Sequence, residues 1–300
     1  MITISIIIVN YKVKEFIIPC IESIYKNKPK NYSFELIVVD NNSNDGSIEA
    51  ISEKFTHVII IENKKNVGFS SAVNQGAKKA EGNFLFVLNP DSLFLEDSLS
   101  KLMLFINKQN NTGVIGPSLV SKAGKIQQSF WRFPTLINTL ISIYNIDFFN
   151  YKKNYANKGK NKILKVDSIS GGAFLISSKL FKSLNGLNEN LFWMEDIDLC
   201  YRIKKLGYDN YFFAETKIIH FQGKSAEKNW TLAISNQLIS KIKYFKLHHS
   251  SFEGIILKNA ILLLSIIKAF LLLLISPYKI KYKNKLSGHL IVIGSIIKKN

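Results

Sequence analysis

Cysteine and acidic residues are scarce in this 300-residue sequence. The two cysteines, Cys20 and Cys200, are too few for a disulfide framework, and neither lies in a Cys-x-x-Cys pattern, so we expect a reducing compartment. Residues 1–11 lack a basic stretch before their apolar run and lack a small-residue cleavage site, which favours a strand over a signal peptide. An internal repeat is also lacking.

The shortage of acidic residues, 22 Asp and Glu against 40 Lys and Arg, gives a formal net charge of +18. This charge favours an anionic partner: nucleic acid, a membrane surface or a phosphorylated small molecule. The sequence has no basic helix with interleaved aromatic residues and no nucleic-acid motif, which argues against nucleic acid. Because lysine is spread over every segment, a general bias in composition is the alternative to any specific partner.

Short β-branched runs alternate with stretches of helical periodicity in the first third of the chain. The pattern predicts strands over 4–9, 34–39, 58–61 and 83–88 and helices over 15–26, 47–55 and 70–80. Further helices are expected over 99–108 and 195–205, strand character over 166–177, and a mixed region over 112–164. This alternation predicts a doubly wound, mostly parallel α/β sheet flanked by helices.

Polar clusters follow three of the predicted strands: Asn10-Tyr11, residues 40–45 and residues 89–92. In doubly wound sheets, ligands bind beyond the carboxyl ends of the strands. Asp40 could accept a hydrogen bond from the N3–H of a uracil or thymine base, and the helix that follows could attract phosphate at its N-terminus. The alternative for this loop is that Asp45 or Ser47 caps that helix, and Tyr11 either stacks on the base or merely ends its strand.

The tetrapeptide from Asn89 to Ser92 places a carboxylate, Asp91, at a strand end where it could hold Mg²⁺ or Mn²⁺. A metal there would neutralise a diphosphate leaving group, although Asn-Pro and Asp-Ser also favour a plain turn. His220 could offer a neutral imidazole to the same metal, although a lone histidine is more often structural.

Three carboxylates, Glu195, Asp196 and Asp198, crowd the start of a predicted helix. Crowded carboxylates raise one another's pKa and suit work as a general base. The alternative is that they serve only as favourable charge near a helix N-terminus. Trp193 lies just before them and could stack on a sugar ring.

The last fifty residues differ from the rest, since 254–276 are almost all apolar apart from Lys258, Asn259 and Lys268. Lysines follow directly, and a second apolar stretch covers 290–297. An apolar helix beside a lysine cluster fits an interfacial membrane anchor, and a buried packing helix is the alternative. We therefore expect a catalytic domain over 1–250 and a membrane-associated helical tail over 251–300.

Taken in order, these motifs resemble family 2 glycosyltransferases of the GT-A fold, over about residues 2 to 248, and within them the rhamnosyltransferase-like subgroup. The matching segments are Ile6-Ile-Ile-Val-Asn-Tyr11, Ile37-Val-Val-Asp-Asn-Asn-Ser43, Asn66-Val-Gly-Phe69, Leu88-Asn-Pro-Asp91, Gly171-Gly-Ala-Phe-Leu175 and Glu195-Asp-Ile-Asp-Leu-Cys-Tyr-Arg202. His220 and Ser225 match the family's downstream His…Ser element.

The resemblance implies a role for each matched residue. Asp40 would read the pyrimidine, Asp91 would bind Mg²⁺ or Mn²⁺, and His220 would assist at the metal or the diphosphate. Asp196 would deprotonate the acceptor hydroxyl beside Glu195, and the sugar would be transferred by direct displacement with inversion. The substrate-binding residues would be Val9, Asn10, Tyr11, Asp40, Asn42, Asn66, Gly68, Phe69, Asn74, Asn89, Gly172 and Trp193.

The implied partners are a nucleotide-sugar donor, dTDP-rhamnose or a UDP-hexose, and a lipid-linked or glycan acceptor at the cytoplasmic face of the cell membrane. A second copy of the chain is a further candidate partner. The family's common Asp-x-Asp metal motif is Asn89-Pro90-Asp91 here, so its first carboxylate is missing. That departure motivates one alternative, a module that binds nucleotide sugars without turnover.

Overall fold

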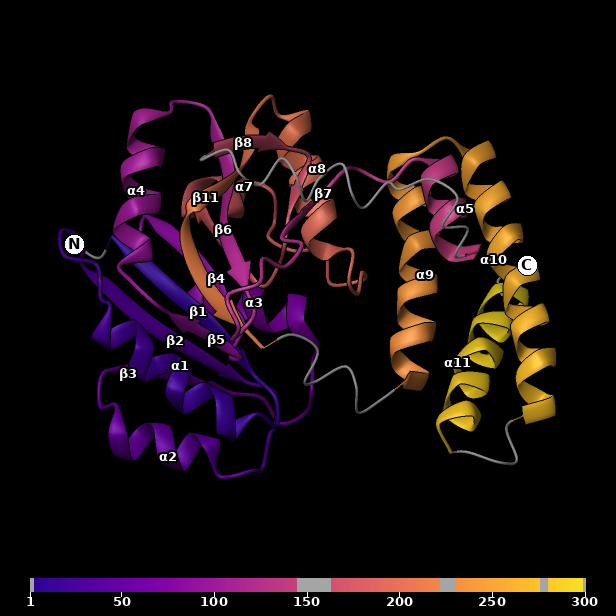
Figure 1. Cartoon of the computed structure of the whole chain (residues 1–300), viewed down its shortest axis with the longest axis horizontal. Coiled ribbons are helices and arrows are strands. Elements are labelled where there is room, and N and C mark those ends of the chain that lie inside the picture. The colour runs from indigo at the N-terminus through magenta and orange to yellow at the C-terminus, as the bar shows by residue number, and fades with distance from the viewer. Residues whose placement is uncertain (1–2, 145–162, 222–229, 276–279, 299–300) are drawn as a thin grey trace. The chain divides into compact units, whose positions relative to one another are not determined.

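The structure is a computed structural model that describes residues 3–144, 163–221, 230–275 and 280–298. These residues form two compact units, and each is described by itself. The first contains the described parts of 1–133, 153–189 and 195–222, and the second contains those of 134–152, 190–194 and 223–300. Figure 1 traces the elements of both along the chain.

Four parallel strands form one half of the sheet in the first unit: β1 (Ile4–Asn10), β2 (Phe34–Asp40), β3 (Val58–Glu62) and β4 (Phe84–Leu88). They lie in the order β3-β2-β1-β4. Parallel strands covered on both faces read as continuous apolar runs, and all seven residues of β1 are buried. The strand order reverses at β1, because β2 lies on one side of it and β4 on the other.

The side chains of β1 alternate between two helical layers. Ile4, Ile6 and Ile8 pack with apolar residues of α1 (Lys14–Lys26), α2 (Ser47–Lys54) and α4 (Ser98–Lys108). Ile7 and Val9 belong to the opposite core, with residues of α3 (Phe69–Lys79), α7 (Ser178–Ser183) and α8 (Glu195–Lys205). The first unit is therefore a sheet between two layers of helices.

The other half of the sheet is mixed. The strand β10 (Ala173–Ser177) runs antiparallel to β4 and to β6 (Thr112–Val120), and β11 (Asp209–His220) runs parallel to β6. Two short strands, β5 (Ser92–Phe94) and β8 (Ile163–Val166), pair with β11. A separate small sheet joins β7 (Phe130–Trp131) to β9 (Ser168–Ile169). The prediction of a mostly parallel α/β sheet flanked by helices is confirmed.

The second unit is helical. Its elements are α5 (Leu136–Tyr144), α9 (Trp230–His248), α10 (Ser251–Ile275) and α11 (Ile280–Ile297). The helices α9, α10 and α11 pack on one another around buried residues such as Tyr244, Leu257 and Val292. The hydroxyl of Tyr144 donates to the carbonyl of Ala260 at 3.0 Å and so ties α5 to α10.

Candidate active site

The predicted site residues of the first unit gather at the carboxyl edge of its parallel strands. Asn10 and Asp40 are the last residues of β1 and β2 and lie side by side in the register. The backbone N–H of Asn41 donates to the carbonyl of Asn10 at 2.9 Å, so the pairing continues past the strand ends. Since the strand order reverses at β1, this edge is the topological switch point, where doubly wound sheets bind their ligands.

Asp40 is only 4% exposed and anchors the loop that follows β2. Its Oδ1 accepts from Asn10 Nδ2 at 2.7 Å and from Ser43 Oγ at 2.5 Å, and its Oδ2 accepts from Ser43 N at 2.9 Å. Asn10 Nδ2 also lies 2.6 Å from Ser47 Oγ. The carboxylate therefore organises the loop from inside, and its predicted contact with a base stays a prediction.

Buried Asn10 also keeps one unused acceptor. Within the described residues its Oδ1 has no hydrogen-bond partner, and the residue is 0% exposed. The residue before it, Val9, is 8% exposed and belongs to the apolar layer on the α3 side. Both side chains are therefore buried inside the protein at this edge, whereas Tyr11 is 38% exposed at the surface.

The start of α2 combines two local devices. Asp45 Oδ1 accepts from Ser47 N at 3.1 Å, and its Oδ2 accepts from Lys14 N, also at 3.1 Å. The N-cap residue itself is Gly46, whose φ of +75° favours glycine. The sequence predicts that Asp45 or Ser47 caps this helix. Asp45 lies one residue before the N-cap, and its side chain accepts from the N–H of Ser47 in the first turn. Asn42 also has a positive φ, +63°, in this loop.

The loop before α3 has the form that its sequence predicts. Asn66 Oδ1 accepts from Gly68 N at 2.9 Å, and Gly68 has a φ of +88°. A Cβ added to Gly68 would meet none of the described residues within 4 Å. Asn41 Nδ2 donates to the carbonyl of Gly68 at 3.3 Å and joins this loop to the one after β2. Phe69 begins α3 and packs against the core on that side.

Asn74 uses its whole amide inside the protein. Its Nδ2 donates to the carbonyl of Leu187 and to Glu189 Oε1, each at 2.9 Å, and its Oδ1 accepts from Leu187 N at 2.9 Å. These bonds hold the segment before α8 against α3. A direct contact between Asn74 and a substrate stays a prediction.

Asp91 and His220 meet at the same edge, beyond the end of β4. Asp91 Oδ1 lies 3.3 Å from His220 Nε2, and the two side chains are 11% and 10% exposed. Asn89 Nδ2 lies 3.2 Å from the same imidazole nitrogen. The backbone places them there, because Phe221 N donates to the carbonyl of Asp91 at 2.9 Å. The residues proposed from sequence for the metal are thus neighbours, although 129 positions separate Asp91 from His220 in the chain.

A glycine pair joins this cluster to Asp196. The carbonyl of Gly172 accepts from Asn89 N at 2.9 Å, and Gly171 N donates to Asp196 Oδ2 at 2.8 Å. A Cβ on Gly171 would stand 3.5 Å from the Asp196 carboxylate, so the backbone approaches the carboxylate closely. Burial raises the pKa of Asp196 to about 6, although the N–H groups of Gly171 and Ile197 stabilise its charged form.

The other two carboxylates of α8 have different surroundings. Asp198 is 1% exposed and its Oδ2 pairs with Arg202 at 2.7–2.8 Å. Arg202 also donates to the carbonyls of Leu184 and Gly186, at 2.7 and 2.9 Å. Glu195 is 7% exposed at the first position of the helix. Asp198 is therefore bound into the fold, while Asp196 faces the glycine pair.

Some predicted residues cannot be joined to this cluster. Trp193 belongs to the second unit, where it has a φ of +63° and is 41% exposed. Ser225 lies outside the described residues. Conversely, several residues that were not among the predicted site residues contact it, as Ser47 and Gly171 do above. Two more are Ser43, which bonds to Asp40, and Gln127, whose side chain contacts His220. Ser43 lies in the polar loop already noted after β2, whereas Gln127 lies in the mixed region, where no motif points to it.

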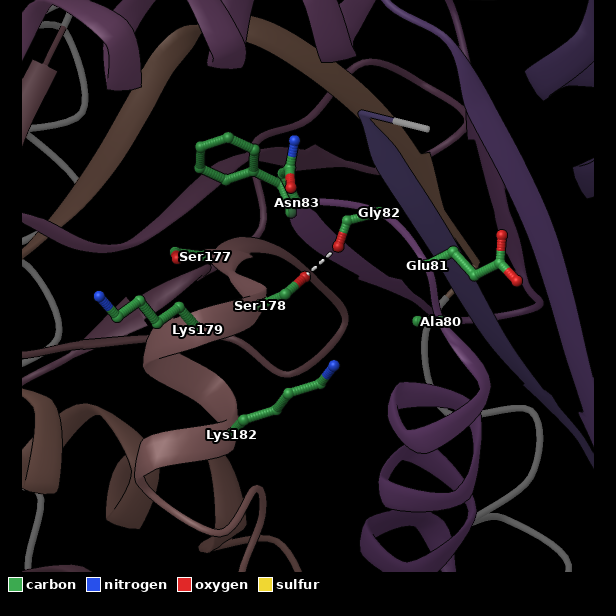
Figure 2. A pocket seen from close by; sticks show the side chains of 9 residues that line it. Ala80, Glu81, Gly82, Asn83, Ser177, Ser178, Lys179 and Lys182 are labelled. Carbon is green, nitrogen blue, oxygen red and sulfur yellow. Dashed lines mark hydrogen bonds between the residues drawn. The ribbon is translucent and has the colours of Figure 1, made fainter. Parts of the chain in front are cut away.

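A pocket also forms at the opposite edge of the sheet (Figure 2). It is lined by residues 80–84 and 177–179 with Lys182, that is, by the start of β4 and the end of β10. Ser178 Oγ closes part of it by donating to the carbonyl of Gly82 at 2.5 Å. Glu81 is the single carboxylate among these lining residues, and the predicted site residues of the first unit lie at the other edge.

The solved structures most relevant here share the fold at low identity. The mannosyltransferase PcManGT from Pyrobaculum calidifontis, solved with GDP-Man and Mn²⁺, aligns with a TM-score of 0.57 at 14% identity and covers 98% of this chain and 86% of its own. GalNAc-T7, solved with UDP, GalNAc and Mn²⁺, aligns with a TM-score of 0.56 at 17% identity, over 73% of this chain but only 44% of its own.

Sequence comparison agrees with the geometry. An N-acetylglucosaminyl-diphospho-decaprenol L-rhamnosyltransferase from Mycobacterium tuberculosis is 22% identical over 211 residues, which cover 65% of this chain and 68% of the relative. The family model for glycosyl transferase family 2 matches residues 5–184, more than half of the chain, and includes β1, β2, β4 and β10 with their site residues. The chain therefore belongs to glycosyl transferase family 2.

Proposed function

We propose that this glycosyltransferase moves a sugar from a nucleotide diphosphate to an acceptor hydroxyl by direct displacement with inversion. One observation carries the proposal. Asp40, bonded to Asn10, lies at the same edge of the sheet as Asp91 with His220, and Asn89 and Gly171-Gly172 join that pair to Asp196. Along that edge would lie a site for the nucleotide, a site for the diphosphate and a general base. The alternative, a binding module without turnover, needs no general base.

The donor would bind across the ends of β1 and β2. Asp40 would accept from the pyrimidine N3–H, with Tyr11 against the base and Asn42, Asn66 and Gly68 around the nucleoside. Gly68 supports this role because its positive φ opens backbone to a ligand where a side chain would stand. The N-terminus of α2 adds a favourable field for phosphate.

Asp91 and His220 fit a divalent cation. One carboxylate and one imidazole nitrogen lie 3.3 Å apart, and Mg²⁺ is often held by one or two carboxylates together with substrate phosphates. The cation would neutralise the developing charge of the diphosphate leaving group. The bound Mn²⁺ of PcManGT and GalNAc-T7 supports this assignment, and Asn89 would contact the diphosphate beside it.

Asp196 would take the proton of the acceptor hydroxyl. Its raised pKa, about 6, makes it a stronger base than an exposed aspartate and still leaves it ionised near neutral pH. Gly171 N holds the carboxylate in place through Oδ2. Glu195 stands next to it in the helix, and Gly172 packs closely beside Asn89, since an added Cβ would stand 3.6 Å from the Asn89 amide nitrogen. The displaced nucleoside diphosphate leaves from the opposite side of the anomeric carbon.

For the substrates, the proposal is rhamnose from dTDP-rhamnose, or a hexose from a UDP-sugar, transferred to a lipid-linked or glycan acceptor in cell-surface glycan synthesis. The activity in the name of the Mycobacterium tuberculosis relative supports this choice, since that protein is a rhamnosyltransferase acting on N-acetylglucosaminyl-diphospho-decaprenol.

The helical unit would bind the cytoplasmic face of the membrane. Among the described residues, one helix segment, Ser251–Leu274, is long and apolar enough to span a membrane, with a mean hydropathy of 2.2. Its exposed large hydrophobic side chains are Phe252, Ile255, Leu263, Ile266, Ile267, Phe270, Leu271, Leu273 and Leu274, and the polar Ser251 and Asn259 are exposed as well. Lys268 is only partly exposed, and its charge acts on His289 of α11, so it lies toward the neighbouring helix. An apolar stripe with the lysine at its border favours a helix lying in the membrane interface.

Donor binding and transfer test the proposed function separately. Thermal unfolding would be followed with UDP, dTDP, GDP and CMP, each with and without Mn²⁺ or Mg²⁺. A ligand at a hundred times its Kd stabilises by about 2.7 kcal/mol, so a metal-enhanced shift with dTDP or UDP is expected. Asp196→Asn should retain that shift and lose sugar transfer. Undiminished transfer by this variant would refute the base assignment.

A further inference from the structure

The side chain of Gln127 contacts His220 at two points. Its Oε1 lies 3.2 Å from His220 Nδ1, and its Nε2 donates to the main-chain carbonyl of His220 at 2.8 Å. A single side chain thus holds both the ring and the backbone of the histidine. Gln127 is only partly exposed, and His220 is 8% exposed.

The hairpin that follows β6 fixes Gln127 in turn. Gln127 N donates to the carbonyl of Leu119 at 2.9 Å, and Val120 pairs with Ile126 across the turn. Within that turn, Ser121 N donates to the carbonyl of Lys125 at 2.8 Å. Because Leu119 and Val120 also pair with β11 near its end, the hairpin and His220 share one rigid frame.

The double contact determines the orientation of the amide. If the Gln127 amide were turned over, its oxygen would face the carbonyl oxygen of His220, and two acceptors would oppose each other. In the orientation that donates to this carbonyl, Oε1 faces the ring, and a hydrogen on Nδ1 completes the second contact. The nitrogen left to face Asp91 Oδ1 and the Asn89 amide is Nε2.

We propose that Gln127 is a positioning residue that holds His220 with Nδ1–H bonded to its amide, so that Nε2 points at Asp91. The inference rests on the proposed role of Asp91 and His220 at the donor diphosphate. A metal-ligating imidazole commonly donates its other N–H to an outer partner, which fixes ring and tautomer. Gln127 supplies that partner with a neutral amide, which leaves the net charge of the cluster unchanged.

The tautomer of His220 can be read directly by NMR. The full-length chain labelled with ¹⁵N-histidine would be recorded at a pH well above the ordinary imidazole pKa, with His220→Gln to assign the signal. In the wild-type chain His220 should be protonated at Nδ1. In Gln127→Leu it should change to the Nε2–H form or to a mixture. An Nε2–H pattern in the wild-type chain would overturn the proposal.

Metal binding supplies the second readout. Free Mn²⁺ would be measured by EPR in the presence of dTDP, with dTDP alone as the blank. Loss of an outer partner typically weakens metal affinity 10- to 100-fold, so Gln127→Leu should bind Mn²⁺ at least about 10-fold more weakly. Gln127→Glu keeps an acceptor for Nδ1–H but loses the donor to the His220 carbonyl, so it should restore only part of the affinity. Equal affinity in wild type and Gln127→Leu would refute the role.

Gln128 provides a matched control on the adjacent position. It is exposed, and its Nε2 lies 3.4 Å from the carbonyl of Phe130 instead of near the site. Gln128→Leu should leave both the NMR pattern and the Mn²⁺ affinity unchanged, and a loss equal to that of Gln127→Leu would mean that the effect is only hairpin packing. If the wild-type chain binds no Mn²⁺ at all, the proposed metal site fails, while the NMR pattern still decides the role of Gln127.

Discussion

At the scale of single residues, the first turn of α8 shows how surroundings separate groups that look alike in sequence. Asp196 and Asp198 are two residues apart and carry the same charge. Asp198 is paired with Arg202, whereas Asp196 receives backbone N–H groups and is raised in pKa by burial. Sequence located the cluster but not this division, because the partners Gly171, Leu184 and Gly186 come from other segments.

The raised pKa of Asp196 sets the acid limb of activity. Because the carboxylate form is the proposed base, kcat/KM should be constant above about pH 6 and should fall about tenfold per pH unit below it. The measurement is a pH–rate profile with donor and acceptor, with circular dichroism to confirm that the chain stays folded. A limb at the ordinary aspartate value, near 4, would show that Asp196 is not the titrating base.

The pair between Asp198 and Arg202 should be a major contributor to stability. In Arg202→Leu, the buried carboxylate and two carbonyls lose their bonds from Arg202, and breaking a buried pair costs about 3–5 kcal/mol. Urea unfolding would measure the loss. Lys204→Leu is the control, since Lys204 is 52% exposed in its pair with Asp209 and should cost less than about 1 kcal/mol. Equal losses in the two variants would contradict the argument.

At the scale of elements, the predicted and the missed strands differ in a physical way. Those of the first half are short runs of mostly apolar residues, nearly all buried in β1, β2 and β4, and the sequence predicts all four within one or two residues. The sequence did not predict β11, because Ala-Glu-Thr at 214–216 breaks its apolar run. The structure shows an irregularity at the same place, since the register with β6 shifts between Phe213 and Lys217. His220, at its end, was selected without the element that positions it.

The segment just before β4 packs closely against β1, and a substitution at Gly82 tests this packing. A Cβ on Gly82 would lie 2.6 Å from Ser5 N and 2.8 Å from Ile4 C, and backbone atoms cannot turn aside. Gly82→Ala should therefore lower the free energy of unfolding by about 1–3 kcal/mol or more. A Cβ on Gly254, in α10, would meet none of the described residues within 4 Å, and its alanine variant should gain about 0.5–1 kcal/mol. Both values follow from denaturant titration, and a neutral Gly82→Ala would disprove the contact.

At the scale of the whole molecule, the two units would work in two environments, water and the membrane surface. The α/β unit would handle soluble nucleotides, and the helical unit exposes an apolar stripe along α10 that water disfavours. The sequence predicts a boundary at residue 250 between the catalytic domain and a membrane-associated tail. This boundary stays a prediction, because it depends on which residues contact a membrane.

Glutamates on the stripe should weaken membrane binding. Phe270 and Leu274 are 64% and 63% exposed, one turn apart on α10. Phe270→Glu with Leu274→Glu should greatly reduce co-sedimentation with anionic phospholipid vesicles and leave the dTDP-induced thermal shift intact. Leu104→Glu is the control, because Leu104 is a comparably exposed leucine on α4, at 52%. Unchanged sedimentation of the double variant would remove the stripe from the membrane contact.

The direction of β10 has a consequence for how such an enzyme can diversify. Because β6 and β10 are antiparallel, the chain leaves β6 at Val120 and enters β10 at Ala173 on the same edge of the sheet, where Asp91 and His220 lie. The segment between these two strands therefore starts and finishes beside Asp91 and His220. Under the proposed function, drift or insertion there would alter which acceptor is admitted, while the strands that would hold the donor keep their register. Selection for a new glycan would thus act on one segment of the gene.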